Sequence, residues 1–123
     1  MKNLIFVFIG GGTGSILRYL LGKWLNNQNS GIPYGTLAAN IIGSFLIGMI
    51  LGYFAKNENI SPATTLLLAT GFCGGFTTFS TFAYESHVFL KSGDFISFAA
   101  YTIGSIVIGF SAVFLGMWLI KFA

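Results

Sequence analysis

With 123 residues, of which 54% are hydrophobic and only 7% are charged, this chain has too few polar side chains for the surface of a soluble domain. Its apolar stretches recur along the whole length, so the composition predicts an integral membrane protein that lies in a lipid bilayer. The net charge of +3 is carried by few residues, and we expect no nucleic-acid partner.

Four apolar stretches are long enough to cross a bilayer, whose core of about 30 Å takes roughly 20 helical residues. We predict spans over residues 4–25, 34–55, 62–90 and 95–122, joined by the turn-rich connections 26–33, 56–62 and 91–94. The fold class is therefore an all-α membrane protein, and residues 1–123 form one transmembrane domain. Lys2 and the apolar residues after it resemble a signal peptide, but we expect them to stay in the mature chain because no soluble part follows.

The first span contains the glycine-rich run Gly10-Gly-Gly-Thr-Gly14, which looks like a phosphate loop. It lacks the Gly-Lys-Ser/Thr pattern and the dinucleotide spacing, so we interpret it as a packing surface between helices. Small residues recur at the same four-residue spacing in every span, which favours tight packing and an oligomer. They are Gly10 and Gly14; Ser44, Gly48 and Gly52; Gly71 and Gly75; and Ala112 and Gly116.

In the second span Thr36, Asn40 and Ser44 form a polar stripe at four-residue spacing. Asn40 is the only amide side chain deep in any predicted span, and its hydrogens are able to face an anion. The alternative interpretation is a hydrogen bond that joins two helices, which is at least as common for a membrane asparagine.

The third span begins at Pro62, with Ser61 as its predicted N-cap, and would be about 43 Å long as one straight helix. That length exceeds the bilayer core, so we expect a break at Gly74-Gly75. Nearby hydroxyls are available to the freed backbone groups: Thr77, Thr78, Ser80 and Thr81. A broken helix offers carbonyls to a cation and amides to an anion. The alternative is a long helix that is merely tilted or kinked.

Phe76, Phe79 and Phe82 recur at three-residue spacing directly after this predicted break. The edge of a phenyl ring is positive, so rings aimed into a narrow, dry passage favour an anion there. Ordinary packing in the core is the alternative for any one phenylalanine, since the chain contains 14 of them.

Further polar side chains lie within the predicted spans. In the last span Tyr101 and Ser105 are one turn apart and Ser111 follows, so their hydroxyls are potential donors. Glu85 is the one carboxylate predicted inside a span, and an acid in a membrane indicates function. Glu85 and Arg18 each have two interpretations, as structural partners or anchors and as parts of a transport path or its vestibule.

Catalytic chemistry finds no support in the composition. The single cysteine, Cys73, and the single histidine, His87, are too few for a metal site or a catalytic dyad. We therefore expect that the protein is not an enzyme.

Positive charges are nearly balanced across the membrane, although lysine and arginine normally set orientation. With four spans, Lys2, Lys56 and Lys121 share one side, whereas Lys23, Lys91 and, if it snorkels, Arg18 share the other. Such a chain is able to insert both ways and pair as an antiparallel dimer. The alternative is that a small protein simply has few charges and that Lys56 lies beside Glu58.

The segments that carry these signals resemble those of a known family. Residues 71–82, Gly-Phe-Cys-Gly-Gly-Phe-Thr-Thr-Phe-Ser-Thr-Phe, are followed by Glu85 and resemble the third-helix signature of the Fluc (CrcB) fluoride channels. Residues 35–44, Gly-Thr-Leu-Ala-Ala-Asn-Ile-Ile-Gly-Ser, are similar to the second-helix motif of that family. Residues 14–19, Gly-Ser-Ile-Leu-Arg-Tyr, also fit, as do the length and the four spans, so the resemblance covers the chain.

This resemblance implies an antiparallel, dual-topology homodimer with two fluoride pores and a central structural sodium ion. It implies that ring edges of Phe79 and Phe82 line the pores and that Asn40 supplies a pore amide. It implies a track of hydroxyls made by Ser80, Tyr101, Ser105 and Ser111. The backbone carbonyls of Gly74 and Thr77 from each subunit would bind the sodium ion.

The implied function is a fluoride-selective channel in a bacterial inner membrane, which passively exports fluoride from the cytoplasm and protects against its toxicity. One alternative is a proton-coupled small multidrug transporter, for which Glu85 is the only candidate acid. A second alternative is a structural subunit of a larger membrane complex, which would conduct no ions by itself.

Overall fold

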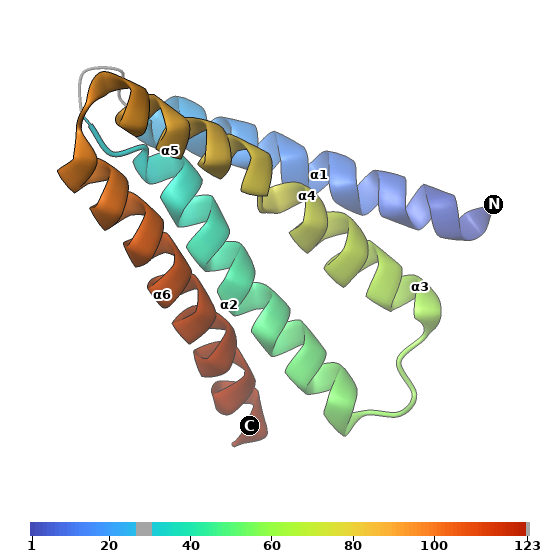
Figure 1. Ribbon diagram of the computed structural model, residues 1–123. Coiled ribbons are helices and arrows are strands. Elements are labelled where there is room, and N and C mark those ends of the chain that lie inside the picture. The colour runs from blue at the N-terminus through green and yellow to red at the C-terminus, as the bar shows by residue number, and fades with distance from the viewer. Residues whose placement is uncertain (27–30, 123) are drawn as a thin grey trace.

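The computed structural model describes residues 1–26 and 31–122, and every regular element in these ranges is helical (Figure 1). The elements are α1 (Lys2–Leu25), α2 (Tyr34–Lys56), α3 (Pro62–Thr65), the π-helical segment η1 (Leu66–Cys73), α4 (Gly74–Phe76), α5 (Phe79–Ser92) and α6 (Phe95–Lys121). Within these described residues, four helical stretches are long and apolar enough to cross a membrane, which confirms the four predicted spans. Residues 27–30 of the first predicted connection lie outside the described residues.

The third span and the last helix begin where the sequence places capping residues. The Ser61 hydroxyl accepts a hydrogen bond of 3.2 Å from the Thr64 amide, with Pro62 in the first turn, so the predicted N-cap is confirmed. The Asp94 carboxylate caps α6 by accepting from the Ser97 amide at 3.1 Å. A hydrogen bond from the Ser97 side chain, and after it the one from the Ser97 amide, hold the pKa of Asp94 below its ordinary value of 3.8.

The helices pack as two pairs. In Figure 1, α1 runs beside the first part of the third span, η1 and α4, and α2 runs beside α6. A side chain at Gly14 would meet the Phe72 carbonyl and, at 2.8 Å, the Phe76 amide nitrogen, so α1 approaches the backbone of η1 and α4 directly. In the same way, a side chain at Gly75 of α4 would meet the backbone of Gly11 on α1. The predicted packing role of these small residues is therefore confirmed.

The α2 and α6 helices also approach each other closely at glycines. A side chain at Gly48 would meet the Val113 carbonyl, and one at Gly116 would meet the Phe45 carbonyl and, at 2.9 Å, the Met49 amide nitrogen. Only glycine permits this backbone contact, because any Cβ would push the helices apart.

The third span is broken as predicted, but the predicted position of the break was wrong. Gly74 has helical angles, φ −62° and ψ −37°, whereas Thr77 and Thr78 are extended, with ψ values of 156° and 118°. The chain does not use the conformational freedom of Gly74-Gly75 at this point. It uses the missing side chain of Gly75 to bring α4 against α1, and the helix continues to Phe76.

Candidate functional site

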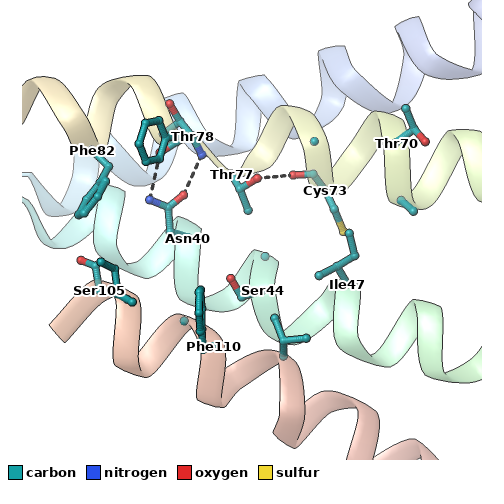
Figure 2. A pocket seen from close by; sticks show the side chains of 17 residues that line it. Asn40, Ser44, Ile47, Thr70, Cys73, Thr77, Thr78, Phe82, Ser105 and Phe110 are labelled. Atoms are coloured by element: carbon teal, nitrogen blue, oxygen red, sulfur yellow. Dashed lines mark hydrogen bonds between the residues drawn. The ribbon is translucent and has the colours of Figure 1, made fainter. Parts of the chain in front are cut away.

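The candidate site is built around the break between α4 and α5, where Asn40 of α2 pairs with the backbone of Thr78. The Thr78 amide donates to Asn40 Oδ1 at 2.7 Å, and Asn40 Nδ2 donates to the Thr78 carbonyl at 3.2 Å (Figure 2). One side chain thus satisfies both backbone groups of an extended residue, in place of the missing helical turn. The interpretation of Asn40 as a bond between helices is confirmed, and its amide retains one further N–H.

At the break, two backbone carbonyls lack the amide partners that they would have in an intact helix. The Thr78 amide would bond to the Gly74 carbonyl in a continuous helix, but it donates to Asn40. The Thr81 amide would bond to the Thr77 carbonyl, but it donates to the Thr78 hydroxyl at 3.2 Å as the N-cap bond of α5. The same two residues, Gly74 and Thr77, both line the cavity described below.

Hydroxyls near the break take up other backbone groups, as predicted for Thr77 and Thr78. Thr77 Oγ1 donates to the Cys73 carbonyl at 2.9 Å, and the Thr78 hydroxyl lies 3.4 Å from that of Ser80. The sequence pattern therefore indicated the right residues, although it placed the break three residues too early.

On the α1 side of the break, Arg18 holds the end of α4. Arg18 Nε donates to the Gly75 carbonyl at 3.1 Å, and Ser15 Oγ donates to the same oxygen at 3.4 Å. A cation at the carbonyl end of a helix is favourable because the carbonyl dipoles point toward it. Arg18 is therefore a structural partner of the break. It lies well before the end of α1 at Leu25, so we do not count it among the positive charges at the membrane surface, and the predicted balance is three lysines on one side against two on the other.

A cavity of about 650 Å³ opens between α2, the third span and α6 at this level (Figure 2). Its polar lining includes Asn40, Ser44, Thr77, Thr78 and Ser105, and most of the remaining wall is apolar. The Ser105 hydroxyl oxygen is buried and, within the described part of the chain, has no hydrogen-bond partner. A buried hydroxyl without a partner costs free energy, so this one is suited to donate to a ligand in the cavity.

Aromatic rings form one end of this cavity. The rings of Phe79 and Phe82 are tilted, with centroids 6.0 Å apart, and Phe82 lies 5.3 Å from the ring of Tyr101. Phe79 is 79% exposed although it lines the cavity, so its ring reaches beyond the chain's own fold.

Glu85 lies behind these rings and accepts two hydrogen bonds from hydroxyls. Tyr101 Oη donates to Oε1 at 2.8 Å, and Thr36 Oγ1 donates to Oε2 at 3.0 Å. Asn26 extends the network, because its Nδ2 donates to Thr36 Oγ1 at 3.3 Å while its Oδ1 accepts from the Gly35 amide at 2.6 Å. This network supports the structural interpretation of Glu85, with the hydroxyls of Tyr101 and Thr36 as its partners.

Comparison with known families shows to which family the chain belongs. The family described as "CrcB-like protein, Camphor Resistance (CrcB)" matches residues 5–117. The chain belongs to this CrcB-like family. Curated relatives named "Fluoride-specific ion channel FluC" include a Gloeothece citriformis protein, 49% identical over 98% of both chains. A Leptospira interrogans relative of the same name is 48% identical over 98% of this chain and 95% of its own, and one from Escherichia coli is 52% identical over 77% and 75%.

In this CrcB-like chain, the structure brings together most of the candidate residues but separates Ser111 from them. Asn40, Phe79, Phe82 and Ser105 line one cavity, with Tyr101 against Phe82. Ser111 lines a different groove between the ends of α2 and α6.

Sequence reasoning missed Asn26 and the contact of Thr36 with Glu85. Asn26 directly follows α1, and the Gly35 amide that it binds lies beyond the connection, so no short-range capping pattern indicates this contact. The contact from Thr36 to Glu85 joins residues 49 positions apart, and no local pattern indicates it.

Proposed function

We propose that this protein is a fluoride-specific channel through which fluoride leaves the cytoplasm passively. The observation that carries the proposal is its identity of 48–49% over almost its whole length to relatives named as fluoride-specific ion channels. The membership in the CrcB-like family and the four apolar spans support the same function. A channel needs no covalent chemistry, and its relatives are ion channels rather than enzymes.

We propose that fluoride passes through the cavity at the helix break. It would shed much of its water there, because the Ser105 hydroxyl and the second amide hydrogen of Asn40 are able to replace it. The positive ring edges of Phe79 and Phe82 would continue the path without binding the anion tightly. Ser80 and Tyr101 lie next to this path, whereas Ser111 lines a different groove of the chain.

The active form is proposed to be an antiparallel homodimer in the inner membrane of a bacterium. Two observations support it. The positive charges of the two predicted sides are nearly balanced, which favours insertion in both orientations. The Phe79 ring is largely exposed at the mouth of the cavity, where a second copy would enclose it and complete a narrow passage.

A sodium ion at the dimer centre is proposed to bind to the carbonyls of Gly74 and Thr77. Both carbonyls lose their helical amide partners at the break, and unwound carbonyls are typical ligands of sodium in membrane proteins. When bound, the ion supplies positive charge that holds the two broken helices together. The chain's own contribution is the break, which Asn40 and the Thr78 hydroxyl keep open.

Fluoride efflux from liposomes tests the function. The purified protein is reconstituted in vesicles loaded with potassium fluoride and potassium chloride, and valinomycin releases the balancing potassium while two electrodes record the anions. We expect rapid fluoride release and little chloride release. Well-folded protein that releases no fluoride would contradict the proposal, and proton flux that Glu85→Gln abolishes would favour a coupled transporter instead.

A further inference from the structure

The outer face of α5 carries a stripe of exposed polar side chains, although α5 belongs to a membrane span. At about 100° per residue, the four members of the stripe lie within an arc of about 60° around the helix. They are Ser80, Tyr84, His87 and Lys91. Ser86 and Phe89 lie on the other side of α5 and are buried. The stripe therefore faces away from α6 and α2, the helices on which α5 packs.

This stripe leads from the helix break toward the membrane surface. Ser80 follows the break directly, and its hydroxyl lies 3.4 Å from that of Thr78. From Ser80 to Lys91 the helix rises about 17 Å, which is roughly half of a bilayer core of about 30 Å. Figure 1 shows that α5 runs from the break to the end of the molecule at which α6 begins. The stripe is thus long enough to connect the surface with the exposed ring of Phe79 at the mouth of the cavity.

The composition of the stripe indicates what covers it. Lipid chains offer no hydrogen bonds, and contacts between membrane helices favour small residues, whereas three of the four side chains here are long and polar. Val88 and Leu90 border the stripe on its two sides and are 44% and 41% exposed, so the polar surface is a narrow one between apolar side chains. These features favour water over lipid or a closely packed helix as the neighbour of the stripe.

The end of the stripe near the surface carries its basic side chains. Lys91 lies in the last turn of α5, and His87 lies one turn deeper. Histidine is the side chain whose charge ordinarily changes between pH 5 and 8. The other groups that titrate on this part of the molecule, carboxylates and lysines apart, are phenols, which ordinarily keep their proton in that range. They are Tyr84 on α5, Tyr34 on α2 and Tyr101 on α6.

Two carboxylates lie near the stripe without pairing with its basic side chains. Glu85 accepts its two hydrogen bonds on the far side of α5, from Tyr101 and Thr36. Asp94 caps α6, and among the described residues it forms no ion pair with Lys91 or His87. An anion that enters along α5 would therefore meet basic groups that no carboxylate pairs with.

We propose that water and fluoride reach the break along this stripe of α5 and that His87, when protonated, attracts the anion into it. The inference rests on the proposed channel function, and it adds a place of entry and a dependence on pH. A unit charge beside a wet path raises the local concentration of an anion by about two- to fourfold, because water screens most of the attraction. His87 therefore tunes the rate of entry and is not required for conduction.

The labelling rate of introduced cysteines tests the water-filled path without measuring ion flux. His87→Cys and Val88→Cys change neighbouring residues at nearly the same depth, of which only the first is on the stripe. We expect a charged methanethiosulfonate reagent to label His87→Cys in liposomes about tenfold faster or more, because the reactive thiolate forms in water and not in lipid. Cys73 is the one native cysteine and is 2% exposed, so the unsubstituted protein supplies the background. Equal rates at the two positions would overturn the path, and so would a lack of labelling in His87→Cys, which would show that lipid or a second copy covers the stripe.

Fluoride efflux at two pH values tests the role of His87. After subtraction of the leak from protein-free vesicles, we expect the unsubstituted protein to release fluoride about two- to fourfold faster at pH 6 than at pH 8. His87→Gln should lose this difference, and His87→Lys should keep the faster rate at both pH values. The same pH ratio in His87→Gln and the unsubstituted protein would overturn the role of His87. Folded protein that releases no fluoride at either pH would contradict the channel function itself, and the labelling rates would still decide whether water reaches the stripe.

Discussion

The glycines of α1 offer the sharpest test of how the break is held, because Gly14 and Gly12 lie on one helix and differ only in what faces them. A Cβ at Gly14 would lie 2.8 Å from the Phe76 amide nitrogen and closer still to the Phe72 carbonyl, whereas a Cβ at Gly12 would meet nothing within 4 Å. Ordinary contact begins near 3.4 Å, so Gly14→Ala must move α4 away from α1 by at least about 0.6 Å.

This displacement has a stability cost and a functional cost. Overpacking of this kind costs about 1–3 kcal/mol, while Gly12→Ala should be neutral or stabilise by up to about 1 kcal/mol through helix propensity. The same movement stretches the hydrogen bonds from Ser15 and Arg18 to the Gly75 carbonyl, now 3.4 and 3.1 Å long. We therefore expect Gly14→Ala to lose fluoride flux as well as stability.

Unfolding by SDS in mixed micelles, followed by circular dichroism, measures the stability of both variants against the unsubstituted protein. Fluoride efflux from liposomes is measured in parallel. Equal unfolding midpoints for Gly14→Ala and Gly12→Ala would refute the reasoning, because the close backbone approach of α1 to α4 would then contribute nothing to stability.

Three further predictions concern single side chains. Asn40→Ala should destabilise the protein by about 2–3 kcal/mol and speed hydrogen exchange at the Thr78 amide, since both backbone groups of Thr78 lose their partner. Thr36→Val, which keeps the shape of a side chain that is 4% exposed, should cost about 1.5–3 kcal/mol in SDS unfolding because Glu85 loses a donor. Asp94→Asn should leave stability near pH 7 almost unchanged but should remove the part of the acid sensitivity that this cap contributes, as seen in thermal unfolding at pH 7 and pH 3.

The sign of the Asp94 effect follows from its pKa, which lies below the ordinary value of 3.8. A carboxylate with a lowered pKa stabilises the fold above that ordinary value, and the contribution disappears as the pH falls through the lowered pKa. The Asn40 prediction fails if exchange at Thr78 is unchanged, and the Thr36 prediction fails if valine matches threonine in SDS unfolding.

Much of the fold was predictable because membrane spans are governed by length and polarity. The predicted spans end within two residues of the helical stretches, and Ser61 caps the third span as expected. Local patterns of small residues also identified the surfaces of closest packing, including Gly14 and Gly75. These features depend on residues near one another in the sequence.

The position of the break was not predictable in the same way. Gly74-Gly75 looked like the weakest point of the helix, yet the backbone opens at Thr77 and Thr78 because Asn40, on a different helix, captures the Thr78 backbone. The separation of Ser111 from the cavity at the break has a related reason.

The spacing between Ser105 and Ser111 puts them on different faces of α6, and their hydroxyls line different grooves. Both outcomes depend on which helices become neighbours, and the sequence pattern of one span does not contain that information.

The central claim is that fluoride passes the cavity at the break along the rings of Phe79 and Phe82. The most direct measurement is the fluoride efflux rate of Phe79→Ile/Phe82→Ile in liposomes, compared with Phe8→Ile, a control whose ring is exposed to the same 79% as that of Phe79. We predict that the double variant assembles normally but conducts about tenfold more slowly or worse, while Phe8→Ile conducts normally. A double variant that conducts at the unsubstituted rate would contradict the account.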